Sequence, residues 1–183
     1  MKNTHLLFLI LLGLNSCNDK EAAPQQTDLY SSCCGAEPVE FISGDAYLFV
    51  PNVFTPNGDG INDFFAPRHN DKILGFDAYS IYTPVGDTVV YANNFYNQDD
   101  PANTSWNGNR ADGTPFVGGF KYEFTVFLAG GGLYKVEGKA CRIACGAEAA
   151  EFKTKPGCFY PAQIGVNGRL DPAVPSGESD CFK

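Results

Sequence analysis

Apolar and polar side chains alternate most regularly between residues 120 and 128. Phe120 and every second residue after it are apolar, whereas Lys121, Glu123 and Thr125 between them are polar. A period of two residues predicts a β-strand that buries one face. Three consecutive glycines at 130–132 give the backbone the freedom that a tight turn needs. Residues 133–143 are therefore expected to return as the partner strand of a hairpin.

Shorter strand-like segments precede this hairpin. Residues 46–50, 76–82 and 88–91 are rich in β-branched and aromatic side chains, and residues 83–87 (TPVGD) have the composition of a turn. A helical period is hard to find, and 15 Phe and nine Tyr supply ample apolar area for a core. The pattern predicts an all-β fold, a sandwich of short strands. Trp106, the only tryptophan, is expected to pack in its core.

The first residues have the pattern of an export signal. Lys2 provides a positive charge, and residues 6–14 form an apolar run that is too short to span a bilayer. Residues 14–17 (LNSC) resemble a bacterial lipobox, in which the cysteine receives a diacylglycerol. We therefore expect residues 1–16 to be a lipoprotein signal peptide and Cys17 to be the lipid anchor in the membrane. The alternative is an ordinary cleaved signal followed by an incidental cysteine.

The charge balance narrows the range of partners. The formal net charge is -8, which disfavours binding to nucleic acid or to anionic lipid headgroups. Residues 17–39 are mostly polar at their start and are expected to form a tether between the anchor and the folded part.

The cysteine count indicates an oxidising compartment. With Cys17 assigned to lipid, six of the seven cysteines remain, and an even number behind an export signal favours disulfides whose pairing the sequence does not decide. A zinc site is the weaker alternative, because no cysteine pair has the usual spacing and His69 is the only histidine after the signal. The six candidates are Cys33, Cys34, Cys141, Cys145, Cys158 and Cys181.

Two regions are expected after the tether. Residues 40–144 should hold the β-sandwich. Residues 145–183 contain four prolines, several glycines and three cysteines, and cannot form a long regular element. We expect a largely irregular C-terminal tail that disulfides hold against the sandwich.

The most informative motif lies at residues 51–65 (PNVFTPNGDGINDFF). It contains one Asn-Gly pair, at 57–58, and one Asp-Gly pair, at 59–60, and both favour turns with positive φ. Asn57, Asp59, Asn62 and Asp63 bring side-chain oxygens into one short loop, the ligand type that Ca²⁺ prefers. The alternative, which we favour over calcium, is that these side chains accept hydrogen bonds from the amides of their own turn. No other cofactor is expected.

This motif resembles the opening signature of the gliding-motility-associated C-terminal domain, the type B sorting domain of the type IX secretion system. Residues 81–91, 106–108 and 112–122 resemble further elements of the family, so the likeness covers about residues 46–144. It implies an immunoglobulin-like antiparallel β-sandwich. In the family the domain usually ends the chain and directs export and attachment, whereas here residues 145–183 follow it.

Two shorter likenesses also concern the cell surface. The acidic residues after Cys17 resemble surface-export signals of lipoproteins in type IX-secreting bacteria, although a plain solvated tether explains them too. Thr88, in the triplet 87–89 (DTV), is similar to O-glycosylation sites of such bacteria.

Together these features predict a non-catalytic outer-membrane lipoprotein, at the cell surface, that presents its sandwich to a protein or polysaccharide. It would be an accessory of a surface, gliding or type IX secretion complex. The first alternative is a type IX cargo whose sandwich is the export and attachment signal. The remote alternative is a glycan hydrolase, disfavoured because no nucleophile or metalloprotease motif is present. His69 and the pair Asp99 and Asp100 are expected to be exposed loop residues without a catalytic role.

Overall fold

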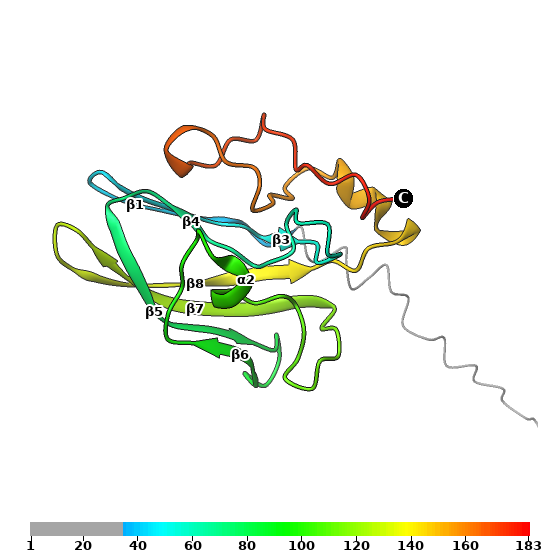
Figure 1. Ribbon diagram of the computed structural model, residues 1–183, viewed down its shortest axis with the longest axis horizontal. Helices are drawn as coiled ribbons and strands as arrows, with labels where there is room; N and C mark the ends of the chain where they lie inside the picture. Colours follow the sequence, from blue (N-terminus) through cyan, green and yellow to red (C-terminus); the bar gives the residue numbers. More distant parts are fainter. Residues whose placement is uncertain (1–34) are drawn as a thin grey trace, which may run out of the picture.

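The computed structural model describes residues 35–183, apart from the side chain of Asn167. Two β-sheets pack face to face (Figure 1). One has five strands in the order β3-β8-β7-β5-β6, and the other has three in the order β1-β2-β4. The strands are β1 Val39–Ser43, β2 Ala46–Val50, β3 Val53–Phe54, β4 Arg68–His69, β5 Ile73–Tyr82, β6 Val89–Asn93, β7 Gly118–Leu128 and β8 Leu133–Arg142. Three short helices are α2 Pro101–Thr104, η2 Ala147–Lys153 and η3 Val166–Gly168.

The predicted fold class, a β-sandwich with a disulfide-linked tail, is confirmed. One pairing departs from the antiparallel expectation, because β3 runs parallel to β8, with Val53 opposite Cys141. The reason is that the chain enters β3 directly from β2 through residues 51–52, with no hairpin to reverse its direction toward β8. All other pairings of the described strands are antiparallel.

The β7–β8 hairpin follows the predicted alternation. Burial along β7 alternates without exception, and its even-numbered residues face the core. The turn at the three glycines closes with a hydrogen bond of 3.2 Å from the Leu128 amide to the Gly132 carbonyl. The other predicted turn closes with a bond of 2.9 Å from the Thr83 amide to the Thr88 carbonyl. Both turns therefore lie where the glycine-containing segments predict them.

Aromatic rings fill the space between the sheets. Trp106 is 1% exposed, as predicted, and its ring centroid lies 4.9 Å from that of Phe120 and 5.6 Å from that of Phe54. Phe65, the last residue of the sequence motif, packs at 4.9 Å from Phe120 and at 5.1 Å from Tyr122. The motif therefore contributes two of its phenylalanines to the centre of the core.

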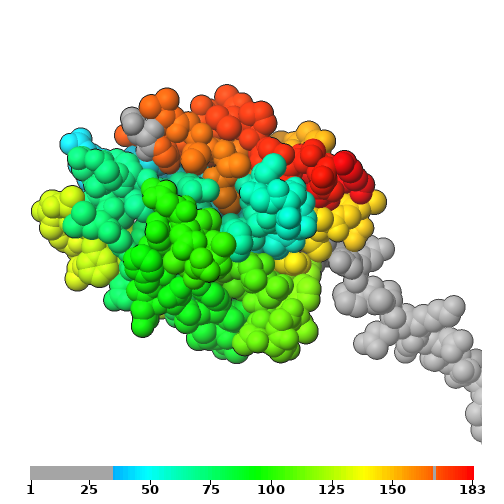
Figure 2. All heavy atoms as spheres, viewed as in Figure 1, coloured from blue at the N-terminus to red at the C-terminus, as the bar shows by residue number. Residues whose placement is uncertain are grey.

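The C-terminal tail, residues 145–183, covers the three-stranded sheet on the side away from this core. Figure 2 shows the orange and red tail lying across the top of the molecule, against the cyan segment that contains the motif. The Leu170 amide donates to the Tyr47 hydroxyl over 2.9 Å, and the Arg169 guanidinium lies 5.1 Å from the Tyr47 ring centre. All five residues of β2 are buried, because the core covers one face of the strand and the tail covers the other.

The tail also has an apolar cluster of its own. A disulfide joins Cys145 to Cys181, as the tail prediction requires. Buried side chains then connect the tail to the start of β3 and the end of β8, so packing as well as disulfide bonding holds it in place. The buried members are Val53, Cys141, Ile143, Ala149, Phe152, Cys158, Tyr160, Cys181 and Phe182.

Within residues 35–183, no helix is both long enough and apolar enough to cross a membrane.

Candidate functional site

The loop of the sequence motif is held by its own side chains. The Asp63 carboxylate accepts three backbone amides: those of Asn57 at 2.9 Å, Gly58 at 2.7 Å and Gly60 at 2.7 Å. Asn57 Oδ1 accepts the Asp59 amide at 3.0 Å, in the arrangement of an Asx turn. These hydrogen bonds are those of the capping alternative.

The structure therefore does not bring all four predicted calcium ligands together. Three of them lie together, namely Asn57, Asp59 and Asp63. The side-chain amide of Asn57 donates to Asp59 Oδ2 over 2.9 Å. Asn62 has a φ of +53° and directs its side chain at the tail instead. In the described part of the chain, no group of three or more His, Cys, Asp or Glu side chains is placed to hold a metal ion. Calcium binding by this loop stays a prediction.

Three polar side chains of the motif bind the tail. Asn52, which is 0% exposed, donates to the Gly157 carbonyl over 2.6 Å and accepts the Phe159 amide at 2.8 Å. Asn62 accepts the Ala162 amide at 2.9 Å. The Thr55 hydroxyl donates to a carboxylate oxygen of the tail. Sequence reasoning missed Asn52 and Thr55, and the only signal for them was a polar side chain on either side of the apolar pair at 53–54.

The tail carboxyl that reaches the motif is Glu178, which is 5% exposed. Its Oε1 accepts from Thr55 and from Asn62, the latter at 3.1 Å, whereas its buried Oε2 has no hydrogen-bond partner among residues 35–183. Burial raises the pKa of Glu178, and the nearby carboxylates of Asp59 and Asp63 raise this pKa further. The folded protein therefore disfavours ionisation of Glu178, although the hydrogen bonds from Thr55 and Asn62 act in the opposite direction on its pKa.

Replacing Glu178 with glutamine tests this contact. Because the folded protein raises the pKa of Glu178, it binds this proton more tightly than the unfolded chain does, so the contribution of Glu178 is full below about pH 4.3, its ordinary pKa, and is lost as pH rises through the folded pKa. Glu178→Gln is uncharged at every pH. We expect it to raise the free energy of unfolding relative to wild type at pH 7.5, with a smaller difference at pH 4, in urea titrations.

The matched control is Glu151→Gln, which removes an exposed carboxylate from η2 in the same tail. A difference between wild type and Glu178→Gln that stays the same at both pH values would show that Glu178 ionisation does not affect the tail.

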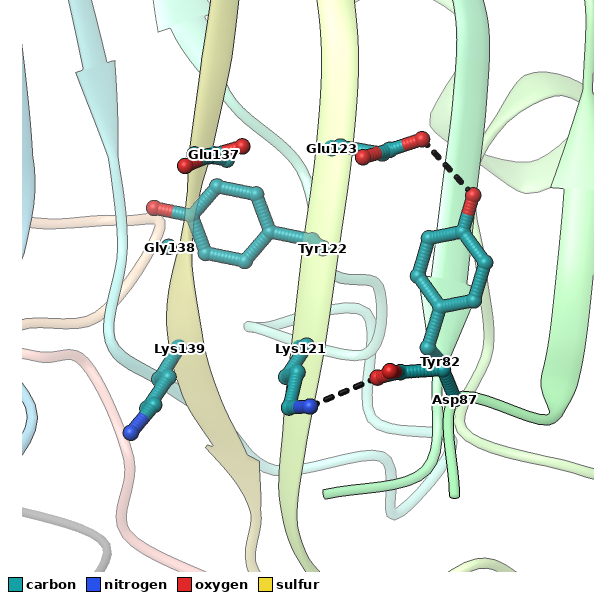
Figure 3. Close-up of a pocket in the computed structure, with 8 residues that line it drawn as sticks. All are labelled: Tyr82, Asp87, Lys121, Tyr122, Glu123, Glu137, Gly138 and Lys139. Carbon is teal, nitrogen blue, oxygen red and sulfur yellow. Dashed lines mark hydrogen bonds and ion pairs between the residues drawn. The ribbon is translucent and has the colours of Figure 1, made fainter. Parts of the chain in front are cut away.

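A second feature is a hollow of about 550 Å³ on the outer face of the five-stranded sheet (Figure 3). The register places Tyr82 of β5 opposite Lys121 of β7, and Lys121 opposite Lys139 of β8. Two residues further along β7, Glu123 faces Glu137 in the same way. The hollow therefore has a row with two lysines beside a row with two glutamates.

Ion pairs accompany these like charges. Lys121 pairs with Asp87 over 2.6 Å, and Lys135 lies 2.9 Å from Glu123 and 3.0 Å from Glu137. In Figure 3 Lys121 points toward Asp87, whereas Lys139 points away from it. Within residues 35–183, Lys139 forms no ion pair shorter than 4.0 Å.

The Tyr82 hydroxyl donates to Glu123 Oε1 over 2.8 Å. This bond raises the pKa of Tyr82, and Lys135 together with Tyr82 lowers the pKa of Glu123. At neutral pH the phenol therefore keeps its proton and Glu123 keeps its negative charge. The bond also holds the hydroxyl end of a ring that lies at the surface of the sheet (Figure 3).

The cysteines fall into two groups. Cys145 and Cys181 form one disulfide, and Cys141 and Cys158 are also disulfide-bonded. Cys33, Cys34 and the predicted lipid site Cys17 lie outside the described residues. Disulfide formation is therefore established for four of the six candidates.

His69 differs from its prediction as an exposed loop residue. It is half-buried in β4, its ring lies 5.3 Å from that of Phe76, and its Nδ1 is 2.9 Å from the Asn70 carbonyl oxygen. Desolvation lowers the pKa of His69. The sequence did not reveal β4, because a strand of two polar residues leaves no alternating pattern.

The remaining predicted positions lie at the surface. Thr88 is exposed in the turn between β5 and β6, as an O-glycosylation site requires. Asp99 and Asp100 lie just before α2, and Asp100 accepts the Asn103 side-chain amide at 3.0 Å. Asp99 is exposed and Asp100 is partly exposed.

The two sheets packed around an aromatic core form a β-sandwich module. Residues 48–135 match the model of the CHU_C family, described as a type IX secretion signal domain. The chain therefore carries a domain of this family, in agreement with the resemblance carried by the motif. Such a domain indicates a cell-envelope or surface protein connected with type IX sorting. No curated protein matches the chain.

The matched segment ends within β8. The end of that strand and the whole tail lie beyond it, although the tail binds the motif through Asn52, Thr55 and Asn62.

Proposed function

We propose that this protein is a non-catalytic cell-envelope lipoprotein, anchored through Cys17, that presents the outer face of its five-stranded sheet to a protein or polysaccharide. The observation that carries the proposal is the difference between the two outer faces of the sandwich. The tail occupies the outer face of the three-stranded sheet, while the other sheet has an open hollow of about 550 Å³.

The groups in this hollow suit binding better than catalysis. The carboxylates of Glu123 and Glu137 share Lys135, and Glu123 also accepts the Tyr82 phenol. A general acid needs a carboxyl that holds its proton near neutral pH, yet the pKa of Glu123 is lowered. This electrostatic setting supports a non-catalytic role.

Anchoring at the outer membrane is supported by the apolar run at residues 6–14 and the lipobox-like segment 14–17. The first strand of the described residues, β1, begins at Val39, at the end of the segment 17–39 that the sequence predicts to be a tether. The match of residues 48–135 to a type IX secretion signal domain supports an accessory role in a gliding or type IX secretion complex.

A second candidate is that the sandwich directs the chain itself through type IX export. The match of residues 48–135 to a type IX secretion signal domain favours it. Both candidates place the protein at the surface, but only the second requires the secretion system for its exposure.

One experiment tests both. A tagged chain and its Cys17→Ala variant are expressed in a strain with a working type IX system and in a matched strain without one, and intact cells are treated with an external protease. We expect wild type to fractionate with the outer membrane and to be cleaved from outside, and Cys17→Ala to be released or left unprocessed.

The strain comparison then separates the candidates. Cleavage in both strains means that exposure does not need type IX export. Protection only in the strain without the system means that the sandwich acts as an export signal. Protection in both strains would contradict surface exposure, and membrane retention of Cys17→Ala would contradict the lipid anchor.

A further inference from the structure

We propose that the hollow on the outer face of the five-stranded sheet is a binding site for a neutral hexose polysaccharide. The ring of Tyr82 would carry one sugar unit, and the surrounding lysines and glutamates would bind its hydroxyl groups. This inference rests on the proposed function, because it names which of the two partner classes that face takes.

The first support is the balance of charge in and beside the hollow. Lys121 and Lys139 line it, and Lys135 lies beside it, paired with Glu123 and Glu137, so three positive charges match three carboxylates. The region is therefore neutral overall on a chain of net charge -8. A neutral ligand meets no net repulsion here, whereas an acidic polysaccharide would gain no net attraction from this region and would meet the negative field of the whole protein. The carboxylates are those of Asp87, Glu123 and Glu137.

The second support is that like charges in the hollow face each other across neighbouring strands, which destabilises the sheet. Like charges that face each other across antiparallel strands are destabilising, and the register places both Lys121 with Lys139 and Glu123 with Glu137. Sugar hydroxyls can accept from the ammonium groups and donate to the carboxylates. A bound sugar would therefore contact both the lysine row and the glutamate row. Lys139, which forms no ion pair within residues 35–183, would gain a hydrogen-bond partner.

The third support is the orientation of Tyr82. Its hydroxyl is held by Glu123 at 2.8 Å, and its ring lies along the sheet rather than projecting from it (Figure 3). The C–H face of a hexose is apolar, and a flat aromatic face whose hydroxyl end is held can cover it without losing side-chain entropy on binding. Ring and polar groups together form the mixed lining that is usual for small-ligand sites of several hundred Å³.

A protein partner fits this surface less well. The centres of protein interfaces are depleted in charged residues, whereas six of the groups in and around the hollow are charged. The exposed apolar side chains nearby, Val85 at 85% and Val89 at 56%, lie in and after the β5–β6 turn and not in the hollow.

The test uses the full chain, with wild-type protein and four variants applied to an array of oligosaccharides. The probes are hexasaccharides of neutral hexoses in several linkages, with oligomannuronate as the acidic counterpart, and hits are titrated by calorimetry. We expect a neutral hexasaccharide to bind with micromolar to millimolar affinity, a range common for small ligand sites. Tyr82→Ala should weaken it at least about tenfold, which corresponds to about 1.4 kcal/mol.

The other variants separate binding from folding. Tyr82→Phe keeps the ring but loses the bond to Glu123, and should retain part of the affinity. Tyr134→Ala removes a tyrosine that is 40% exposed on β8 outside the hollow, and should bind as wild type does. Lys139→Ala changes an exposed side chain without an ion pair among residues 35–183, so its effect reports binding and not stability.

Three outcomes would overturn the inference: no neutral hexasaccharide binds, Tyr82→Ala and Lys139→Ala bind as tightly as wild type, or oligomannuronate binds more tightly than every neutral probe. A protein partner whose binding depends on Tyr82, in the absence of sugar binding, would overturn the inference and leave the proposed function standing. Failure of surface exposure in the protease experiment would instead overturn the proposed function.

Discussion

Replacing Asn52 with alanine is expected to lower the free energy of unfolding by about 3 kcal/mol, because each buried group left unpaired costs about 1–3 kcal/mol. The side chain is 0% exposed and connects three segments of the chain. Its Nδ2 donates to the carbonyls of Ala36 and Gly157, and its Oδ1 accepts the amide of Phe159. Alanine would leave two carbonyls and one amide, each in a part-buried hydrogen bond, without these partners.

Urea unfolding followed by the fluorescence of Trp106, the only tryptophan, measures this change. Hydrogen exchange at the Phe159 amide should quicken by a larger factor than exchange in β7, because the tail loses its contact with the motif first. The control is Asn103→Ala, which removes an exposed asparagine bonded only to Asp100 and should cost less than about 0.5 kcal/mol. Equal costs for the two variants would contradict the role given to Asn52.

The hairpin of β7 and β8 could be predicted from sequence because its information is local. The alternation along β7 and the glycines at 130–132 lie within about twenty-five residues of each other, and burial follows the pattern. β2 was also found, although its five buried residues give no alternation, since both of its faces are covered. Its aromatic and β-branched composition was sufficient.

The strands that escaped prediction carry little local information. β3 and β4 have two residues each, and β1 alternates only weakly between half-buried and exposed positions. Their pairing is set by distant partners, as in the parallel contact of Val53 with Cys141. A strand of two residues has no period that a sequence pattern can report.

The contacts of the candidate site also fall into local ones, which the sequence could predict, and long-range ones, which it could not. The capping of the motif by Asp63 is local, spans six residues or fewer and could be expected from the residue types. The contacts of Asn52 and Thr55 with the tail join residues more than 100 positions apart, so no window of sequence contains both partners. The prolines and cysteines of the tail predicted its irregularity and its disulfide but not the surface that it covers.

The hollow on the outer face could not be predicted without the register of three strands, β5, β7 and β8. The alternation along β7 predicted that Lys121 and Glu123 share one face. Their alignment with Tyr82 depends on irregularities between β5 and β7, where the register shifts between Ile73 and Gly75 and again between Asp77 and Ser80. Each such shift moves a side chain relative to its neighbours. Gly75 is the residue type that often marks such an irregularity, but the second shift has no comparable signal in the sequence.

Replacing Phe65 with alanine is expected to cost about 3–5 kcal/mol of unfolding free energy, the range for removing a fully buried phenylalanine. Phe65 is 0% exposed, and its ring meets four others at centroid distances between 4.9 and 6.4 Å. Its amide also donates to the Trp106 carbonyl over 2.9 Å, which joins the end of the motif to the segment after α2. The cavity would lie where both sheets meet.

Thermal and urea unfolding measure the loss, and a red shift of the Trp106 emission would report water or looser packing beside the indole, which lies next to Phe54 and Phe120 in the same cluster. The matched control is Phe95→Ala, a phenylalanine that is 56% exposed, for which a loss below about 1 kcal/mol is expected. If the two substitutions cost the same, Phe65 does not lie at the centre of the core, and the motif would serve recognition alone. A large cost confined to Phe65 means instead that the family signature is also a folding element, so substitutions in it must be shown to leave the protein folded before any effect on sorting is assigned to recognition.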